Sequence, residues 1–238
     1  MNKVIRIGVI VIFVGFLFAL AAYNSMHPSQ KQFGVWNSAM TMGNKETAEH
    51  HFVMYTDIFC PYCDKFSNAV TANLEDFKTR YIDGNKILFE IRVTDLNYLS
   101  GHSDNSLPAG EGAYCAAKQN NFWGYYHALL GKLFEDYHSK GIGVDRNSEH
   151  IPELAIEYFY DAAEQGGLDR SQFISCMENH EGKAELDRNT TKTSQTLNGG
   201  VPYFVFDKFV YSGFMGDWDT TADYENVKLI MEAGLETK

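Results

Sequence analysis

Hydrophobic residues are distributed along the chain in three different ways. Residues 4–22 form one apolar stretch in which Arg6 is the only charged residue. Residues 47–106 and 198–238 combine short apolar runs, typical of strands, with the three- and four-residue spacings of amphipathic helices. Residues 107–197 carry helical spacings without strand signals. The pattern predicts an α/β fold, interrupted by an all-helical insertion and preceded by an N-terminal apolar helix.

The N-terminal stretch has the length of a membrane span. As a helix, at ~1.5 Å per residue, it would extend about 28 Å, close to the ~30 Å hydrocarbon core of a bilayer. Lys3 and Arg6 precede its uncharged part, residues 7–22, and the next charged residue is Lys31, so the positive-inside rule predicts a cytoplasmic N-terminus and an exported remainder.

Two fates remain open for this segment. Residues 1–24 fit a retained single-pass anchor in the cell membrane. Ala19-Leu20-Ala21 also fits a signal-peptidase site, and cleavage there would give a secreted domain. A buried core helix is disfavoured, because no polar residue interrupts residues 7–22.

The α/β region begins after a polar linker over residues 25–46, which we expect to end in an edge strand around 34–42. Apolar runs over 51–56 and 87–93 predict strands, and the spacing between them predicts a helix over 61–80. A strand, a helix and a second strand in this order predict a parallel strand pair with a helical crossover.

In the insertion and at the end of the chain, the spacing of apolar residues, the helix-capping residues and the turn residues predict the elements. Pro152 suits the first turn of a helix over 154–164, and Asp169, with Gln172 three residues later, suits the start of a helix that carries Cys176. One helical stripe consists of Phe122, Tyr126, Leu129 and Leu133. Runs at 201–206 and 209–212, around Asp207-Lys208, predict a hairpin, and a helix over 223–233 closes the chain.

We therefore expect five segments. They are the anchor or signal (1–24), the linker (25–46), a first α/β part (47–106), the helical insertion (107–197) and a second α/β part (198–238). Composition agrees with a folded protein, since 45% of the 238 residues are hydrophobic. A net charge of −11 argues against a nucleic-acid partner.

The candidate chemistry lies in a Cys-x-x-Cys motif at the junction of a strand and a helix. Cys60 would stand exposed at the helix N-terminus, where free N–H groups and the helix dipole favour a thiolate. Cys63 would lie one turn deeper and resolve a mixed disulfide formed at Cys60. Half of a zinc site is the alternative, but none of the eight histidines falls in a second ligand pair of suitable spacing. We expect no metal.

The motif and three other segments resemble one family. Residues 52–66, with Tyr-Thr-Asp-Ile-Phe-Cys-Pro-Tyr-Cys at their centre, resemble the active-site segment of exported DsbA-type thiol–disulfide oxidoreductases. Residues 114–129 and 168–176 are similar to helices of that family's insertion, and residues 200–205 to the loop that bears its cis-proline. The resemblance spans about residues 48–235.

The resemblance implies a thioredoxin-like fold and a set of site residues. Cys60 and Cys63 would be the redox pair, with Pro61 and Tyr62 between them and the Val201-Pro202 loop beside them. An ordinary strand start is the alternative for that loop. The redox-active disulfide would serve without a further cofactor. Implied partners are unfolded exported proteins with cysteines and a quinone-linked membrane protein of the DsbB or vitamin-K-epoxide-reductase type, which would reoxidise the pair.

Tyr62 departs from the family pattern. Strongly oxidising members have a histidine between the cysteines, whereas a tyrosine is neutral at physiological pH. Asp57 and Asp64 would oppose a thiolate, and Lys65 would partly offset them. The direction of electron flow therefore stays open.

Cys115 and Cys176 are the remaining cysteines, and each falls in a predicted helix of the insertion. An oxidising compartment favours a structural disulfide between them. Two buried free thiols, or a second redox pair, are the alternatives.

Three functions fit these observations. The first is an extracytoplasmic dithiol oxidase that donates the Cys60–Cys63 disulfide to exported proteins. The second is a membrane-tethered reductase or isomerase. The third is a module that binds clients without turnover, which the intact Cys60 and Cys63 disfavour.

Overall fold

The computed structural model describes residues 37–96, 104–196, 200–207 and 209–236. The anchor or signal over 1–24 lies outside these residues. Among the helices that the structure does describe, none combines the length and the apolar character needed to cross a membrane.

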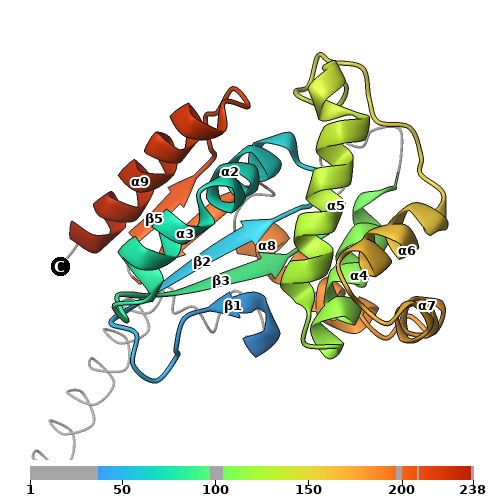
Figure 1. Ribbon diagram of the computed structural model, residues 1–238, viewed down its shortest axis with the longest axis horizontal. Coiled ribbons are helices and arrows are strands. Elements are labelled where there is room, and N and C mark those ends of the chain that lie inside the picture. Colours follow the sequence, from blue (N-terminus) through green and yellow to red (C-terminus); the bar gives the residue numbers. More distant parts are fainter. Residues whose placement is uncertain (1–36, 97–103, 197–199, 208, 237–238) are drawn as a thin grey trace, which may run out of the picture.

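A five-stranded mixed sheet forms the centre of the molecule (Figure 1). Its strand order is β1-β3-β2-β4-β5, and β2 and β3 run parallel while the other neighbours are antiparallel. The strands are β1 (Thr41–Met42), β2 (His50–Thr56), β3 (Ile87–Val93), β4 (Tyr203–Phe206) and β5 (Phe209–Ser212). The expected parallel pair is confirmed, and β1 forms an edge of the sheet.

Helices α2 (Pro61–Ala72) and α9 (Thr220–Glu236) pack against each other beside the sheet. Phe52 of β2 lies at the centre of the core, with its ring 5.5 Å from those of Phe89 and Phe204 and 6.5 Å from that of Phe66 in α2. Helix α9 packs closely on Phe206 of β4 at Gly234, where a Cβ atom would collide with the phenyl ring. The helix that begins at Cys60 is therefore held on a rigid aromatic layer.

Two expected helices differ from the structure. The single helix over 61–80 is wrong, because α2 stops at Asn73 and is followed by α3 (Leu74–Phe77) and the π-helical turn η3 (Lys78–Ile82). Asn73 Nδ2 donates to the carbonyls of Ala69 and Thr220, which fixes the break. In the insertion, α6 (Ile156–Gln165) begins at Ile156, after Pro152 rather than with it in the first turn.

The insertion consists of helices and packs at one end of the sheet. It comprises α4 (Ser106–Lys118), α5 (Phe122–Asp136), η4 (His138–Lys140), α6, α7 (Arg170–Glu178) and α8 (Lys183–Thr196). The expected stripe of α5 is buried at all four positions, Phe122, Tyr126, Leu129 and Leu133. Asp169 caps α7 through its side chain, which accepts the N–H of Gln172. Helix α8 returns to contact β3.

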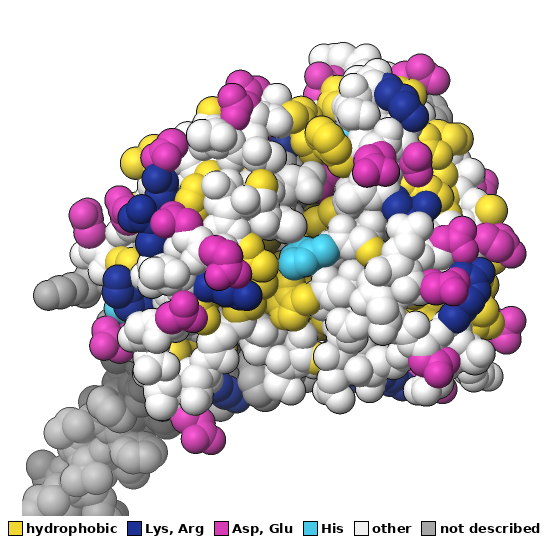
Figure 2. All heavy atoms as spheres, viewed as in Figure 1, with side chains coloured by type: hydrophobic (Ala, Val, Ile, Leu, Met, Phe, Trp, Pro, Cys, Tyr) yellow, Lys and Arg dark blue, Asp and Glu magenta, His cyan; other side chains and the backbone are white. Residues whose placement is uncertain are grey.

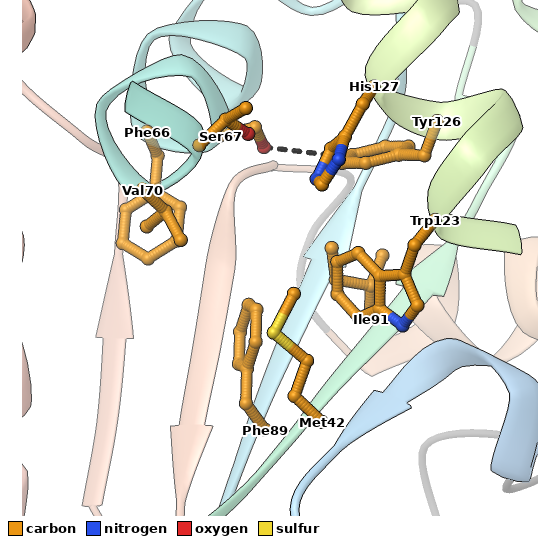
Figure 3. A pocket seen from close by; sticks show the side chains of 10 residues that line it. Met42, Phe66, Ser67, Val70, Phe89, Ile91, Trp123, Tyr126 and His127 are labelled. Carbon is orange, nitrogen blue, oxygen red and sulfur yellow. Dashed lines mark hydrogen bonds between the residues drawn. The ribbon is translucent and has the colours of Figure 1, made fainter. Parts of the chain in front are cut away.

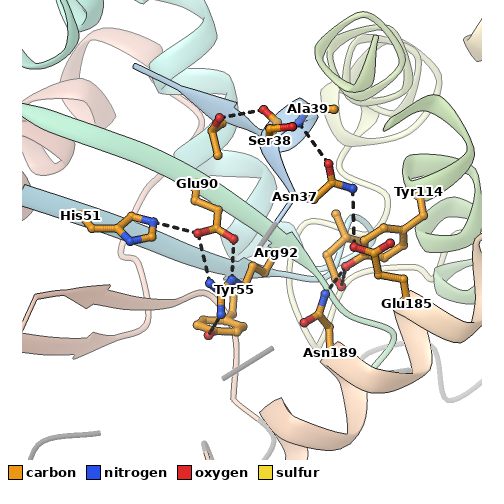
Figure 4. Close-up of polar contacts among 12 residues, drawn as sticks. Asn37, Ser38, Ala39, His51, Tyr55, Glu90, Arg92, Tyr114, Glu185 and Asn189 are labelled. Atoms are coloured by element: carbon orange, nitrogen blue, oxygen red, sulfur yellow. Dashed lines mark hydrogen bonds and ion pairs between the residues drawn. The ribbon is translucent and has the colours of Figure 1, made fainter. Parts of the chain in front are cut away.

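The sheet face away from α2 carries a buried charged network (Figure 4). Arg92 donates two hydrogen bonds to the Glu90 carboxylate, at 2.7 and 3.1 Å, and a third to the Tyr55 hydroxyl at 2.9 Å. The His51 Nε2 atom lies 2.8 Å from the same carboxylate. Each charge in this network has a partner, as burial requires.

Candidate active site

Cys60 is the N-cap residue of α2, directly after the turn that ends β2. Its carbonyl accepts hydrogen bonds from the N–H groups of Cys63 at 2.9 Å and Asp64 at 3.0 Å. Pro61 takes the first helical position, where an N–H group would have no intrahelical partner. The strand and the helix thus present both cysteines at one end of α2, in the dithiol form.

Cys60 is less exposed than we expected. Only 2% of its surface is accessible, because the loop at residues 200–202 lies over it. The Cys60 thiol lies 3.6 Å from the Val201 carbonyl oxygen, to which it donates. The Val201–Pro202 peptide bond is cis, and the Pro202 carbonyl accepts the Gly213 N–H at 2.8 Å. Two segments 141 residues apart in sequence therefore meet at the sulfur.

Cys63 lies one turn further along α2 and is 1% exposed. Burial raises the pKa of its thiol well above the ordinary value, and the neighbouring Cys60 raises it further. The Thr56 side chain and the Asp57 backbone act in the opposite direction on this pKa, with smaller effects. Cys63 is thus held as a neutral thiol in the dithiol form.

Asp57 lies in the turn between β2 and Cys60. Burial raises the pKa of its carboxyl group to about 6. Hydrogen bonds from the N–H groups of Phe59 at 2.9 Å and Leu96 at 3.1 Å partly counter that rise. The side chain therefore joins the dithiol turn to the segment that follows β3.

Asp64 forms a buried pair with His138 of η4. The His138 Nδ1 atom lies 2.7 Å from Asp64 Oδ2, and both side chains are at most 1% exposed. Burial raises the pKa of Asp64, and the contact with His138 limits the rise. The ring of Trp218, from the segment before α9, lies 4.6 Å from the His138 ring. Three separate parts of the chain meet here, directly beside Cys63.

Tyr62 is the half-buried residue between the two cysteines. The ammonium group of Lys65 lies 5.2 Å from the centre of the Tyr62 ring and 5.4 Å from that of Trp218. Lys65 is thus drawn towards two aromatic faces. His138 and Trp218 were missed from the sequence, where neither has a local signal that connects it to the Cys-x-x-Cys motif.

Cys115 and Cys176 are joined by a disulfide bond, the pairing that the sequence favoured. The bond links α4 to α7, with an S–S distance of 2.04 Å and a Cα–Cα distance of 5.8 Å. Both residues are buried among apolar neighbours of the insertion. This pair therefore ties the insertion together and does not adjoin the Cys60–Cys63 motif in sequence.

The seam between α2 and α5 is closely packed (Figure 3). Ser67 and Tyr126 hydroxyl oxygens lie 2.7 Å apart, and the cavity beside them measures about 10 Å³, room for about one water molecule.

Figure 2 shows hydrophobic side chains and a histidine in the hollow between the two lobes on this face, with acidic and basic side chains interspersed around it. The seam joins the two parts of the molecule rather than opening a second site.

Comparison with known proteins agrees with this architecture. A family model described as thioredoxin matches residues 37–225. No curated protein matches the sequence significantly. Among solved structures, BdbD from Bacillus subtilis in its oxidised form is 15% identical with a TM-score of 0.59, and the match covers 88% of this chain and 96% of that one.

Two other solved structures are similar. DsbA from Chlamydia trachomatis is 16% identical with a TM-score of 0.55, over 86% of this chain and 96% of that one. MdbA, a thiol–disulfide oxidoreductase from Corynebacterium diphtheriae, is 18% identical with a TM-score of 0.53, over 81% and 91%. The chain therefore belongs to the thioredoxin family and has the fold of the DsbA-type thiol–disulfide oxidoreductases.

Proposed function

We propose that the protein is a dithiol oxidase that donates a Cys60–Cys63 disulfide to other proteins. A client thiolate attacks the Cys60 sulfur, the Cys60–Cys63 bond breaks, and Cys63 leaves and takes up a proton. A second client thiolate then attacks the client sulfur of the mixed disulfide and releases Cys60. The client loses two electrons and two protons, and the protein gains them as two thiols. The redox-active disulfide needs no further cofactor for this exchange.

The observation that carries this proposal is the buried Cys63 with its raised pKa. A protonated Cys63 is a poor nucleophile, so it rarely attacks Cys60 to return the client unoxidised. The same protonation would slow a reductase, in which Cys63 must attack to release the product. Protonation of the released Cys63 therefore traps the product of forward transfer, whereas the raised pKa itself slows the departure of Cys63 from the disulfide.

Access to Cys60 is part of the proposed mechanism. Cys60 is 2% exposed, and its thiol contacts the Val201 carbonyl in the dithiol form. In the disulfide form Cys60 has no proton to donate to Val201, and a client sulfur must reach Cys60 past this loop. The backbone of the same loop then lies beside the client chain, where main-chain groups can pair with an extended polypeptide.

The proposed location is outside the cytoplasm, at the membrane or secreted after cleavage. The Cys115–Cys176 disulfide supports this location, because such bonds persist in oxidising compartments. The apolar stretch over residues 4–22 would supply the anchor or signal. A quinone-linked membrane protein of the DsbB or vitamin-K-epoxide-reductase type would restore the Cys60–Cys63 disulfide after each transfer.

The second candidate is a reductase or isomerase, and Tyr62 is the observation that favours it. A neutral side chain between the cysteines adds no positive charge to stabilise the reduced pair, in contrast to a histidine. That lack of charge reduces the oxidising strength of the pair.

The redox state of Cys60 and Cys63 in cells separates the two candidates. We would trap thiols with an alkylating mass tag in a Cys115→Ser/Cys176→Ser chain, so that the gel shift reports the Cys60–Cys63 pair alone. An oxidase keeps the pair mainly as a disulfide. A pair found mainly as thiols would replace the oxidase proposal with the reductase.

A further inference from the structure

A second concave site lies between α2, α5 and the start of α9. Its volume is about 240 Å³, less than the ~300–1,000 Å³ of typical small-molecule pockets, so it suits one side chain better than a cofactor. Phe134 of α5 and Trp218 supply aromatic walls, and Gly131 leaves α5 bare at its edge. Most of the lining is apolar, and the seam shown in Figure 3 is a separate place in the fold.

Lys65 lines this cavity, and among the residues that the structure describes it forms no hydrogen bond and no ion pair within 4 Å, although its charge interacts with the more distant Asp223 carboxylate. It is 7% exposed, and its ammonium group faces the rings of Tyr62 and Trp218. Arg92, the other buried basic residue in the described part of the chain, is instead fully engaged by Glu90 and Tyr55 (Figure 4). Two aromatic faces attract the Lys65 charge but are not conventional hydrogen-bond acceptors for its three N–H donors.

A single carboxylate is the acceptor that fits Lys65 best. Charge-assisted hydrogen bonds are about twice as strong as neutral ones, and the apolar walls strengthen them further. Asp223 also lines the cavity, but its two oxygens accept the backbone N–H groups of Asp217 and Trp218. Glu135 is exposed at the rim. These two carboxylates repel every anion, a multiply charged one such as phosphate more strongly than a single carboxylate, and Lys65 repels a cation.

The position of the cavity connects it to the redox pair. Tyr62, the neighbour of the Lys65 ammonium group, stands between Cys60 and Cys63. Lys65 follows Cys60 by five residues, which is about 7.5 Å along the helix axis and ~140° around it, so their Cα atoms lie about 9 Å apart. An extended client chain, at ~3.3 Å per residue, covers that distance in two or three residues.

We propose that this cavity binds a glutamate or aspartate side chain of the client, two or three residues from the cysteine that bonds to Cys60. Lys65 recognises the carboxylate, and Phe134 and Trp218 enclose the methylene groups. This inference rests on the proposed function in one respect, namely that the polypeptide in the site is a redox client. The protein would then select cysteines in acidic surroundings.

The first experiment measures binding without redox chemistry. The full chain with Cys60→Ser and Cys63→Ser is titrated with two ten-residue peptides, each with one central cysteine. One has Glu three residues before and after the cysteine, and the other has Gln at both positions. We expect calorimetry to give a Kd about tenfold lower for the Glu peptide, as a charged hydrogen bond predicts. Equal Kd values would overturn the proposal.

Three substitutions in this chain locate the preference. Lys65→Met keeps the apolar stem and removes the charge, and we expect the Gln-to-Glu ratio of Kd values to fall to about one. Gly131→Leu fills the cavity from α5, where a Cβ meets no atom within 4 Å, and it replaces glycine by a better helix former. Gly131→Leu should lose the preference for the Glu peptide although Lys65 is intact. The test therefore stays decisive even if Lys65→Met does not fold.

Lys132→Met is the matched control, because Lys132 also lies over a tyrosine ring, 4.5 Å from the centre of Tyr158, but does not line the cavity. In Lys132→Met, the tenfold ratio of the Kd of the Gln peptide to that of the Glu peptide should persist. A preference that survives both Lys65→Met and Gly131→Leu, or one that Lys132→Met abolishes equally, would overturn the proposal. Binding with the expected ratio, but no oxidation of either peptide by the disulfide form of the wild-type chain, would contradict the oxidase function while leaving the carboxylate site supported.

Discussion

The two cysteine pairs of this protein lie in different surroundings, one among ionisable side chains and the other among apolar ones. Cys60 and Cys63 share the first turn of one helix, and buried ionisable groups, Asp57 and the Asp64–His138 pair, lie around them. Cys115 and Cys176 are 61 residues apart on two helices of an apolar bundle. The first environment can respond to a change of charge on sulfur, whereas the second can only hold two helices together.

The largest expected difference between the pairs is in activity. Cys60→Ser removes the sulfur that a client attacks, so oxidation of a reduced, unfolded test protein should be abolished. Cys115→Ser/Cys176→Ser should retain it, because that pair takes no part in the exchange. Free-thiol assays of the test protein measure both rates. Undiminished oxidation by Cys60→Ser would remove the functional distinction between the pairs.

The second prediction concerns the mixed disulfide. In Cys63→Ala the Cys60 thiolate can attack a disulfide of another protein, one sulfur of which leaves as a thiolate, and no internal thiol is then present to break the mixed disulfide. Covalent adducts of Cys60 with disulfide-bearing proteins should therefore accumulate. Non-reducing gels should show high-mass bands that disappear on reduction. The Cys60→Ala/Cys63→Ala chain is the control and should give none. Absence of adducts on Cys63→Ala, while the wild type turns over, would contradict the mechanism.

The third prediction concerns stability. The Cys115–Cys176 bond closes a loop of about 60 residues in the unfolded chain, so its loss should lower the free energy of unfolding by ~4 kcal/mol in the chain-entropy model. Denaturant unfolding of Cys115→Ser/Cys176→Ser against the wild type measures the change. A variant as stable as the wild type would mean that the bundle does not need the bond.

The fourth prediction uses pH to test the ionisable surroundings of the first pair. Burial raises the pKa of Asp57 from 3.8 to about 6. Between these two pH values the folded protein therefore keeps a proton on Asp57 that the unfolded chain has lost. The protonated Asp57 therefore contributes fully to stability below pH 3.8. As the pH rises to about 6, this contribution is lost and the free energy of unfolding falls by about 3 kcal/mol.

Asp57→Asn has no such titration, so its unfolding free energy should fall less between pH 4 and 6. Urea unfolding at intervals of half a pH unit gives both curves. Identical slopes for the wild type and Asp57→Asn would show that this carboxyl group does not titrate with folding. Asp64 and Asp223, whose pKa values are also raised, contribute slopes of the same sign in both proteins.

Local patterns in the sequence predict the framework of the site. Apolar runs give β2 and β3, the strand–helix junction gives the Cys60–Cys63 motif, and the spacing of Phe122, Tyr126, Leu129 and Leu133 gives the buried face of α5. These features depend on neighbours three or four residues away. Such distances are what periodicity reports.

Features built from distant segments are not predicted in this way. The contact of Asp64 with His138, the packing of Trp218 on His138, and the loop over Cys60 all depend on how the insertion and the end of the chain meet α2. The break at Asn73 also depends on a distant partner, since its side chain donates to Thr220. For this reason the exposure of Cys60 was overestimated, and Lys65 was treated only as a nearby charge.

The division of the sheet between two ends of the chain has a consequence for biosynthesis. Strands β2 and β3 and both redox cysteines leave the ribosome first, then the insertion, and only afterwards the loop at Val201 and strand β4. Until β4 pairs with β2, the central strand has one open edge and Cys60 has no loop above it. Among the cysteines, Cys63 is the first partner that Cys60 meets, and Cys115 emerges long before Cys176. The order of synthesis therefore favours the Cys60–Cys63 pairing and leaves Cys115 without its partner until Cys176 has been made.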